Sequence, residues 1–252
     1  MRRVLGLDIG SRSVDAVWLE GVTVVDAAVA DSGFDPASVA AAFVDRGDHD
    51  LIVATGYGRH VARESFGAEV VTEIKAYAVG ASALFPQAAA VLDIGGQDTK
   101  AISLSAGGRV ADFEMNDKCA AGTGKFLEVM ARALGFTLEE MAARSLAADG
   151  DVQISSMCTV FAESEVTELV HRGVDRGLIA RGLHESIVRR TISSLKRVGA
   201  SGPLVFAGGV ARNPAMVALV RESYAGEVLV PAHAQTVGAY GAALAASAGT
   251  EL

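Results

Sequence analysis

Two cysteines are the residues in this sequence whose placement points most directly to chemistry. Cys119 precedes a Gly-containing turn and an expected helix whose apolar face includes Leu127, Met130 and Leu134, and Cys158 precedes a second helical run. A thiolate at the start of a helix faces the positive end of the helix dipole and free N–H groups, which favour an anion or an anionic metal cluster. A single free cysteine is more often a small buried hydrophobe, so the two must be judged with their surroundings.

The segment around Cys119 does not fit a Walker A phosphate-binding loop. Gly124-Lys125 ends a Gly-rich turn, but Phe126 stands where that motif needs Ser or Thr, and Cys119 stands where it needs its first Gly. A Walker-type nucleotide site is therefore not expected here.

Composition narrows the class of protein. The chain has 252 residues, enough for one large domain or two modest ones, and a formal net charge of -8. This charge argues against nucleic acid and against an anionic membrane surface as the main partner. We find no apolar stretch near the roughly 18 residues of a membrane span, and the apolar run after Met1-Arg2-Arg3 meets Asp8 too soon for a signal peptide. We therefore expect a cytoplasmic protein, whose thiols are free, catalytic or metal-bound in that reducing compartment.

Expected strands and helices alternate along the chain, which is typical of an α/β protein. Apolar runs and turn residues predict strands at 4–9, 14–19, 22–29, 51–54, 88–94, 101–104, 110–113, 204–206 and 228–230. Helices are expected after Asp35-Pro36, at about 59–66 and 73–84, after each cysteine, from the capping box at Thr137, up to Gly199, after Asn213-Pro214, and from about 236 to the end.

Two segments repeat one pattern. An apolar strand delivers an aspartate, skips one apolar residue and turns through Gly and polar residues into another strand, in Asp8-Ile9-Gly10-Ser11-Arg12-Ser13 and again in Asp93-Ile94-Gly95-Gly96-Gln97-Asp98-Thr99-Lys100. Coincidence is the alternative, but such a repeat indicates two similar halves that face each other.

These turns have the chemistry of a phosphate site. Glycines let backbone N–H groups approach a phosphate, so two facing turns could clamp the β- and γ-phosphates of a nucleotide. Asp8 and Asp93 would then hold Mg²⁺, through waters because this ion keeps much of its hydration shell. Ser11 and Ser13 could donate hydroxyls, and Gly208-Gly209, in a third turn, leave room for a base or ribose.

In their order, the three turns resemble the phosphate-1, phosphate-2 and adenosine segments of the actin, Hsp70 and sugar-kinase superfamily. Within it, four segments resemble the activator ATPases of 2-hydroxyacyl-CoA dehydratases and the related ATPase subunits of benzoyl-CoA reductase (BadF/BadG/BcrA/BcrD type): 54–59, 93–100, 116–124 and 158–165. The resemblance covers nearly the whole chain, and the cysteine segments are specific to this branch.

The resemblance implies an actin/Hsp70-like ATPase fold with two duplicated ribonuclease-H-like halves and a nucleotide cleft between them. The N-terminal half would be 1–87, joined by the C-terminal helix 236–252, and 88–235 would carry the cysteines. Asp8, Asp93 and Gln97 would be catalytic, with Gln97 orienting water. Nucleotide contacts would come from Gly10, Ser11, Arg12, Ser13, Gly95, Gly96, Gln97, Gly208, Gly209, Asn213 and Gln235.

The resemblance also implies a homodimer that shares one [4Fe–4S] cluster through Cys119 and Cys158. Such a cluster takes four thiolates and each chain supplies two, so two chains on a two-fold axis complete the site. The expected function is an ATP-dependent one-electron donor, which takes an electron from ferredoxin or flavodoxin and passes it to a dehydratase or reductase component. The alternatives are a small-molecule kinase or a nucleotide-sensing scaffold of the same fold.

The histidines, two glutamates and the segment before Cys119 allow three further expectations. The five histidines show no metal-ligand spacing, so surface or helix-face positions are expected for them. Glu163 and Glu165 are either solvated helix charges or hydrogen-bond near the cluster. The turn after Asp93 leads through two short strands into Cys119, so nucleotide binding should change the position of the cysteine.

Overall fold

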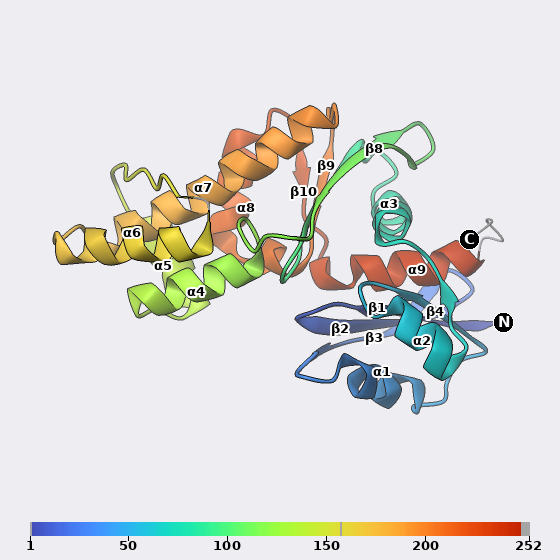
Figure 1. The fold of residues 1–252 in the computed structure, drawn as a ribbon. Coiled ribbons are helices and arrows are strands. Elements are labelled where there is room, and N and C mark those ends of the chain that lie inside the picture. Colours follow the sequence, from blue (N-terminus) through green and yellow to red (C-terminus); the bar gives the residue numbers. More distant parts are fainter. Residues whose placement is uncertain (1, 157, 248–252) are drawn as a thin grey trace.

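Two five-stranded sheets with the same strand order build the protein (Figure 1). The computed structural model describes residues 2–156 and 158–247. The first sheet has the order β3 (Thr23–Asp31), β2 (Ser13–Glu20), β1 (Arg3–Ile9), β4 (Leu51–Thr55), β5 (Glu69–Val70). The second has the order β8 (Arg109–Asn116), β7 (Thr99–Ser105), β6 (Ala90–Ile94), β9 (Leu204–Ala207), β10 (Val228–Leu229). In each sheet the first three strands are antiparallel and the last two run parallel to the central one, so the predicted internal repeat is confirmed.

The repeat extends to the turns. Asp8 near the end of β1 pairs with Thr55 on β4, and Asp93 near the end of β6 pairs with Ala207 on β9. The residue after each partner is a glycine with φ of +86° that faces the aspartate carboxylate. A Cβ at either glycine would lie 2.6 Å or less from a carboxylate oxygen, so both positions need Gly for space and for conformation.

Local sequence signals explain the helix starts. Asp35 caps α1 (Pro36–Val44) by accepting from Ser38 N, and Asn213 caps α8 (Pro214–Ser223). The expected capping box opens α5 (Leu138–Ala147). The other helices are α2 (Arg59–Phe66), α3 (Glu73–Leu84), α4 (Gly124–Leu134), α6 (Thr159–His171), α7 (Arg176–Arg197), α9 (Val237–Ser247) and the short 3₁₀ turns η1 (Gly209–Arg212) and η2 (Ala234–Thr236).

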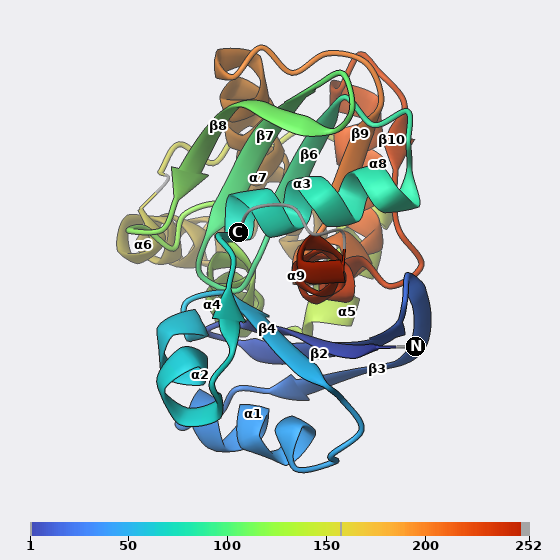
Figure 2. The same ribbon diagram turned by 90° about the vertical axis from the view of Figure 1, so that its right-hand side faces the viewer.

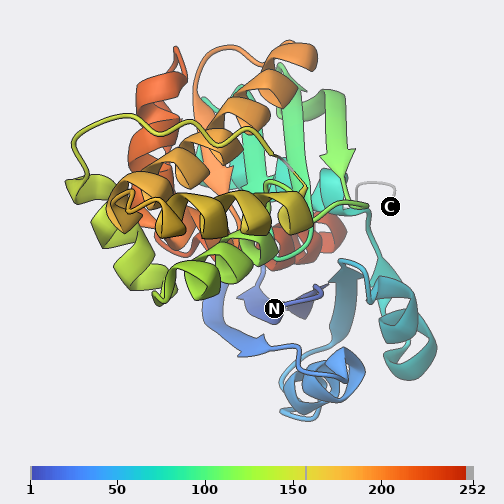
Figure 3. The same cartoon turned by 60° about the vertical axis from the view of Figure 1, so that its left-hand side comes forward.

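Helices cover both faces of each sheet. In the first half, α9 packs on β1, β2 and β4, while α1 and α2 cover the other face. Figure 2 shows α3 and α9 between the two sheets, and Figure 3 shows α4 to α7 together in front of the second sheet, on the face opposite α3. The contact between α3 and α9 is close enough that a Cβ on Gly241 would lie 1.8 Å from Ala76 O.

The C-terminal helix α9 therefore packs against the first half of the molecule. The predicted boundary at 87/88 falls between α3 and β6 and stays a prediction, because α3 packs on β6, β7 and β8 of the second sheet as well as on α9. Residues 248–252 of the expected C-terminal helix lie outside the described residues.

In the part of the chain that the structure describes, no helix has both the length and the apolar character needed to cross a membrane.

Candidate functional site

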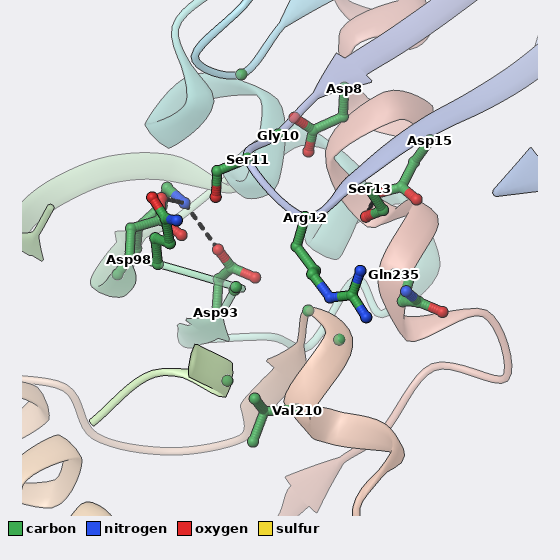
Figure 4. A pocket seen from close by; sticks show the side chains of 18 of the residues that line it. Asp8, Gly10, Ser11, Arg12, Ser13, Asp15, Asp93, Asp98, Val210 and Gln235 are labelled. Carbon is green, nitrogen blue, oxygen red and sulfur yellow. Dashed lines mark hydrogen bonds and ion pairs between the residues drawn. The ribbon is translucent and has the colours of Figure 1, made fainter. Parts of the chain in front are cut away.

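A cleft of about 1190 Å³ lies between the two halves, at the ends of β1 and β6. Every residue expected to contact nucleotide or Mg²⁺ lines it (Figure 4). These are Asp8, Gly10, Ser11, Arg12, Ser13, Asp93, Gly95, Gly96, Gln97, Gly208, Gly209, Asn213 and Gln235. The structure thus brings the three sequence turns to one site, and what each residue binds there stays a prediction.

The two repeated aspartates are buried in the floor of this cleft. Burial, and secondarily the nearby Asp15 carboxylate, raises the pKa of Asp8 well above its usual range. Burial also raises the pKa of Asp93 to about 6, although the Lys100 cation opposes this shift. Asp93 Oδ1 is buried and finds no hydrogen-bond donor among the described residues. Hard oxygen donors with an unsatisfied carboxylate oxygen fit a Mg²⁺ ion, which would supply the missing partner.

Lys100 is a central residue that the sequence analysis did not single out. Its Nζ lies 2.8 Å from Asp93 Oδ2, 2.8 Å from Glu73 Oε2 and 2.5 Å from Asp98 Oδ2, and 5.2 Å from the centre of the Tyr77 ring. Its side chain is 3% exposed; burial opposes the charge, but the three carboxylates raise the pKa of Lys100 well above its usual value. A lysine directly before the expected strand 101–104 was the available signal, because a buried lysine must be paired.

Ser13 and Asp15 form a second missed contact. Ser13 Oγ donates to Asp15 Oδ2 at 3.2 Å, so the hydroxyl that was expected to donate to phosphate already has an acceptor. Burial raises the pKa of Asp15 to about 7. Asp15 lines the same cleft and adds to the acidic surroundings of Asp8.

Asn213 is engaged on both sides of its amide. Its Oδ1 accepts from Ala215 N and Met216 N at the start of α8, and its Nδ2 lies 3.1 Å from His184 Nε2. His184 Nδ1 lies 2.8 Å from Ala180 O, which assigns the proton to Nδ1 and leaves Nε2 to accept from Asn213. Asn213 therefore fixes the cleft wall with its side chain.

His184 lies on a helix face, one of the two expected positions, but that face is buried. This histidine is fully buried in α7, because its ring bridges a helix carbonyl and the Asn213 amide. Burial lowers the pKa of His184 to about 4. Spacing rules for metal ligands do not detect a histidine used in this way.

The two cysteines are exposed, free thiols. Cys158 is the N-cap residue of α6, as expected, but Cys119 lies five positions before α4. The first amides of α4 are not available to it, because Gly124 N and Lys125 N donate to Gly95 O and Gly96 O at 2.9 and 2.8 Å. The expectation that the Cys119 thiol faces the start of α4 is therefore corrected: that helix start holds the turn after Asp93.

Both cysteine loops are tied down by polar side chains. Asn116 Nδ2 donates to Cys119 O at 2.8 Å. The Glu165 carboxylate accepts from Ser155 N and Ser156 N, each at 2.9 Å, and from Ser155 Oγ. Glu165 is thus not a solvated charge: partial burial opposes its ionisation, but these hydrogen bonds lower its pKa.

The helical run expected after Cys158 is present as α6, and its first turn carries exposed apolar side chains. Val166 is buried, but Val160 and Phe161 are 68% and 67% exposed beside the exposed cysteine. Within the described residues of one chain, no three His, Cys, Asp or Glu side chains are grouped so as to hold a metal ion.

Comparison with known proteins agrees with this geometry. Residues 5–246 match the model of the BadF/BadG/BcrA/BcrD ATPase family, and the chain belongs to this family. An activator of lactoyl-CoA dehydratase from Anaerotignum propionicum is 43% identical over 249 residues, 95% of each chain.

Two solved structures resemble the whole chain. Component A of (R)-2-hydroxyglutaryl-CoA dehydratase from Acidaminococcus fermentans superposes with a TM-score of 0.91 at 36% identity, over 99% of each chain. The activator of 2-hydroxyisocaproyl-CoA dehydratase from Clostridium difficile, solved with bound ADPNP, gives a TM-score of 0.88 at 36% identity, over 98% of this chain and 95% of that one. A ROK family glucokinase from Streptomyces griseus, at 14% identity and a TM-score of 0.60, shares the fold alone. The predicted actin-like ATPase fold and the resemblance to the activator ATPases are confirmed.

Proposed function

We propose that this protein is an ATP-driven, one-electron-donating activator of a 2-hydroxyacyl-CoA dehydratase or a related acyl-CoA reductase. The names of its relatives support the partner class, and the ADPNP complex of one relative supports a nucleotide in the cleft. The observation that carries the electron-transfer part is the exposure of both cysteines, because free cysteines are otherwise among the most buried residues.

The nucleotide site would use the cleft residues as follows. The Gly10–Ser13 and Gly95–Gln97 turns would bind the phosphates, and Gly208, Gly209 and Gln235 would border the nucleoside. Asp8 and Asp93 would hold Mg²⁺ through waters, which supplies charge neutralisation for the phosphates. Lys100 holds Asp93 in place by a 2.8 Å ion pair, so the carboxylate keeps one oxygen toward the cleft. Gln97 lines the cleft, where it would orient the attacking water.

The cluster site would form between two copies of the chain. Cys119 and Cys158 of each copy would together ligate one [4Fe–4S] cluster, which supplies a one-electron carrier when bound. A single chain offers two thiols, and no complete ligand group is found among its described residues, so a two-fold dimer is the simplest way to complete the site. Ferredoxin or flavodoxin would supply the electron, and a reducing cytoplasm would keep the thiols available.

Iron content tests this assignment. Anaerobically reconstituted protein should carry about four iron atoms per dimer, and Cys119→Ser or Cys158→Ser should lose most of them. Asn116→Ala serves as the control, because it loosens the Cys119 loop but leaves both thiols. Full iron content and an unchanged spectrum in either cysteine variant would refute the cluster site, whereas the ATPase assignment would stand.

A further inference from the structure

One arginine in the cleft is held by carboxylates from both halves of the molecule. Arg12 Nη1 donates to Asp31 Oδ1 at 3.1 Å, at the end of β3 in its own sheet. Its Nε donates to Glu128 Oε1 at 2.9 Å, on α4. The buried residues of α4 belong to the core of the second half, so the pair Arg12–Glu128 joins the halves across the cleft.

Arg12 also lies where the two Gly-rich turns meet. Its stem runs over the turn after Asp93, because a Cβ on Gly96 would lie 2.5 Å from Arg12 Cβ. The Arg12 side chain is 57% exposed in the cleft, whereas Glu128 is 22% exposed. A guanidinium at this point is accessible to a phosphate, which it binds in the same bidentate manner as a carboxylate.

Glu128 has a second cation close by. Lys125 Nζ, on the same helix, lies 3.3 Å from Glu128 Oε2. If Arg12 turned toward a ligand, Glu128 would therefore keep a positive neighbour. Exchange of partners is possible without an uncompensated charge, and α4 would lose its tie to the first sheet.

We propose that Glu128 and the terminal phosphate of bound ATP compete for Arg12, which makes Glu128 a positioning residue that links the nucleotide state to α4. ADP lacks that phosphate and leaves Arg12 with Glu128. This inference rests on the proposed nucleotide site and adds to it the residue that transmits the nucleotide state to α4. Because the coupling is a free energy shared by two sites, loss of the ion pair must change nucleotide affinity as well as the position of α4.

The start of α4 connects this pair to Cys119. Thr123 Oγ1 donates to Ala120 O at 2.7 Å, next to the cysteine, and Thr99 Oγ1 donates to Gly122 O at 3.0 Å. A shift of α4 therefore pulls on the backbone that carries the thiol. The second half can transmit the change without any contact between nucleotide and cysteine.

Nucleotide affinity gives the first test. The 252-residue chain is freed of iron by a chelator, reduced and transferred to a buffer that contains Mg²⁺. It is then titrated by calorimetry with ADP and with a non-hydrolysable ATP analogue. Glu128→Gln should bind the analogue about two- to fivefold more tightly than wild type, with little change for ADP, because the ion pair no longer has to be given up. Glu139→Gln removes one exposed negative charge from the same cleft and should change both affinities alike.

Alkylation of Cys119, followed by mass spectrometry, gives the second test. Cys119 of wild type should be alkylated at different rates in the ADP-bound and the analogue-bound protein. In nucleotide-free Glu128→Gln, Cys119 should already be alkylated at the rate of the analogue-bound wild type. Asp31→Asn, which loosens Arg12 within its own half, should keep the difference. Analogue affinity in Glu128→Gln that is unchanged or weaker, or a nucleotide-dependent rate that persists in it, overturns the proposal. Failure of wild type to bind either nucleotide would instead refute the proposed nucleotide site.

Discussion

Removal of Lys100 is the perturbation whose consequence the structure defines most sharply. Lys100 Nζ is the cation shared by Asp93, Asp98 and Glu73, whose side chains are 1%, 25% and 13% exposed. Lys100→Met keeps the length and the apolar stem but leaves these carboxylates without their counter-charge. Removal of one partner of a buried ion pair typically costs about 3–5 kcal/mol. Because Asp98 is partly solvated, we expect the lower end, about 3 kcal/mol.

Thermal unfolding measures this loss in the presence of EDTA at pH 7.5. For a chain of this size, about 3 kcal/mol corresponds to a fall in Tm of about 6–12 °C. Lys125→Met is the control, because Lys125 is 47% exposed and its pair with Glu128 should contribute at most about 1 kcal/mol.

The loss of stability in Lys100→Met should depend on pH in a defined direction. The pKa of Asp93 is already raised to about 6 with Lys100 present, and loss of the cation raises it further. A carboxyl with a raised pKa binds its proton more readily in the folded state than in the unfolded state, so its destabilising effect fades as the pH falls. The difference in Tm between Lys100→Met and wild type should therefore narrow from pH 8 to pH 5. A variant within 1 kcal/mol of wild type, or a gap that widens on acidification, would refute the assignment of Lys100 as the buried counter-ion.

Three further outcomes follow from single contacts. Asp8→Asn should lower Mg²⁺-dependent ATP hydrolysis about 100-fold or more. Its Tm should stay equal or rise, because burial raises the pKa of Asp8 and disfavours its charge. Unchanged hydrolysis would mean that the nucleotide site is misplaced. Glu165→Gln should raise the alkylation rate of Cys158 in the metal-free protein, because it weakens the clamp on residues 155–156, whereas Glu163→Gln on the exposed face should not; equal rates in both variants would exclude the clamp. Burial lowers the pKa of His184 from 6.5 to about 4, so this residue should contribute a loss of about 3 kcal/mol of unfolding free energy as the pH falls from 6.5 to 4. Urea titrations should show it as the difference between wild type and His184→Gln, because the raised-pKa carboxyls titrate alike in both.

The fold could be predicted from the sequence because its signals are local and repeated. Asp35-Pro36 and the capping box at Thr137 each specify their own helix start, and both are present in the structure. The strand expected at 88–94 begins two residues late, because the amides of Ala88 and Ala89 donate to Phe85 O and Pro203 O in loops. Local patterns do not show which loop carbonyl an amide will reach.

The residues of the cleft were predictable for the same reason, but their partners were not. Asp8 and Asp93 stand at equivalent points of two sheets, so a motif found twice also locates the floor of the cleft. Lys100, Asp15 and Glu128 carry no motif of their own. Their roles arise only when β7, β2 and α4 are packed around the cleft, which brings together groups as far apart in sequence as Arg12 and Glu128.

The path from the nucleotide site to Cys119 illustrates the difference between what local motifs predict and what packing creates. The sequence suggested a connection through the strands β7 and β8, which are joined along the chain to Cys119. The structure contains a shorter one, because the carbonyls of Gly95 and Gly96 accept from the first amides of α4. The turn that would bind phosphate is thereby held to the start of α4 on one side, while Arg12 is held to its second turn on the other. A nucleotide that changes either contact acts on one helix, α4, and Cys119 lies in the loop directly before that helix. The coupling therefore needs no change inside either sheet, only a different balance among the polar contacts at the start of α4.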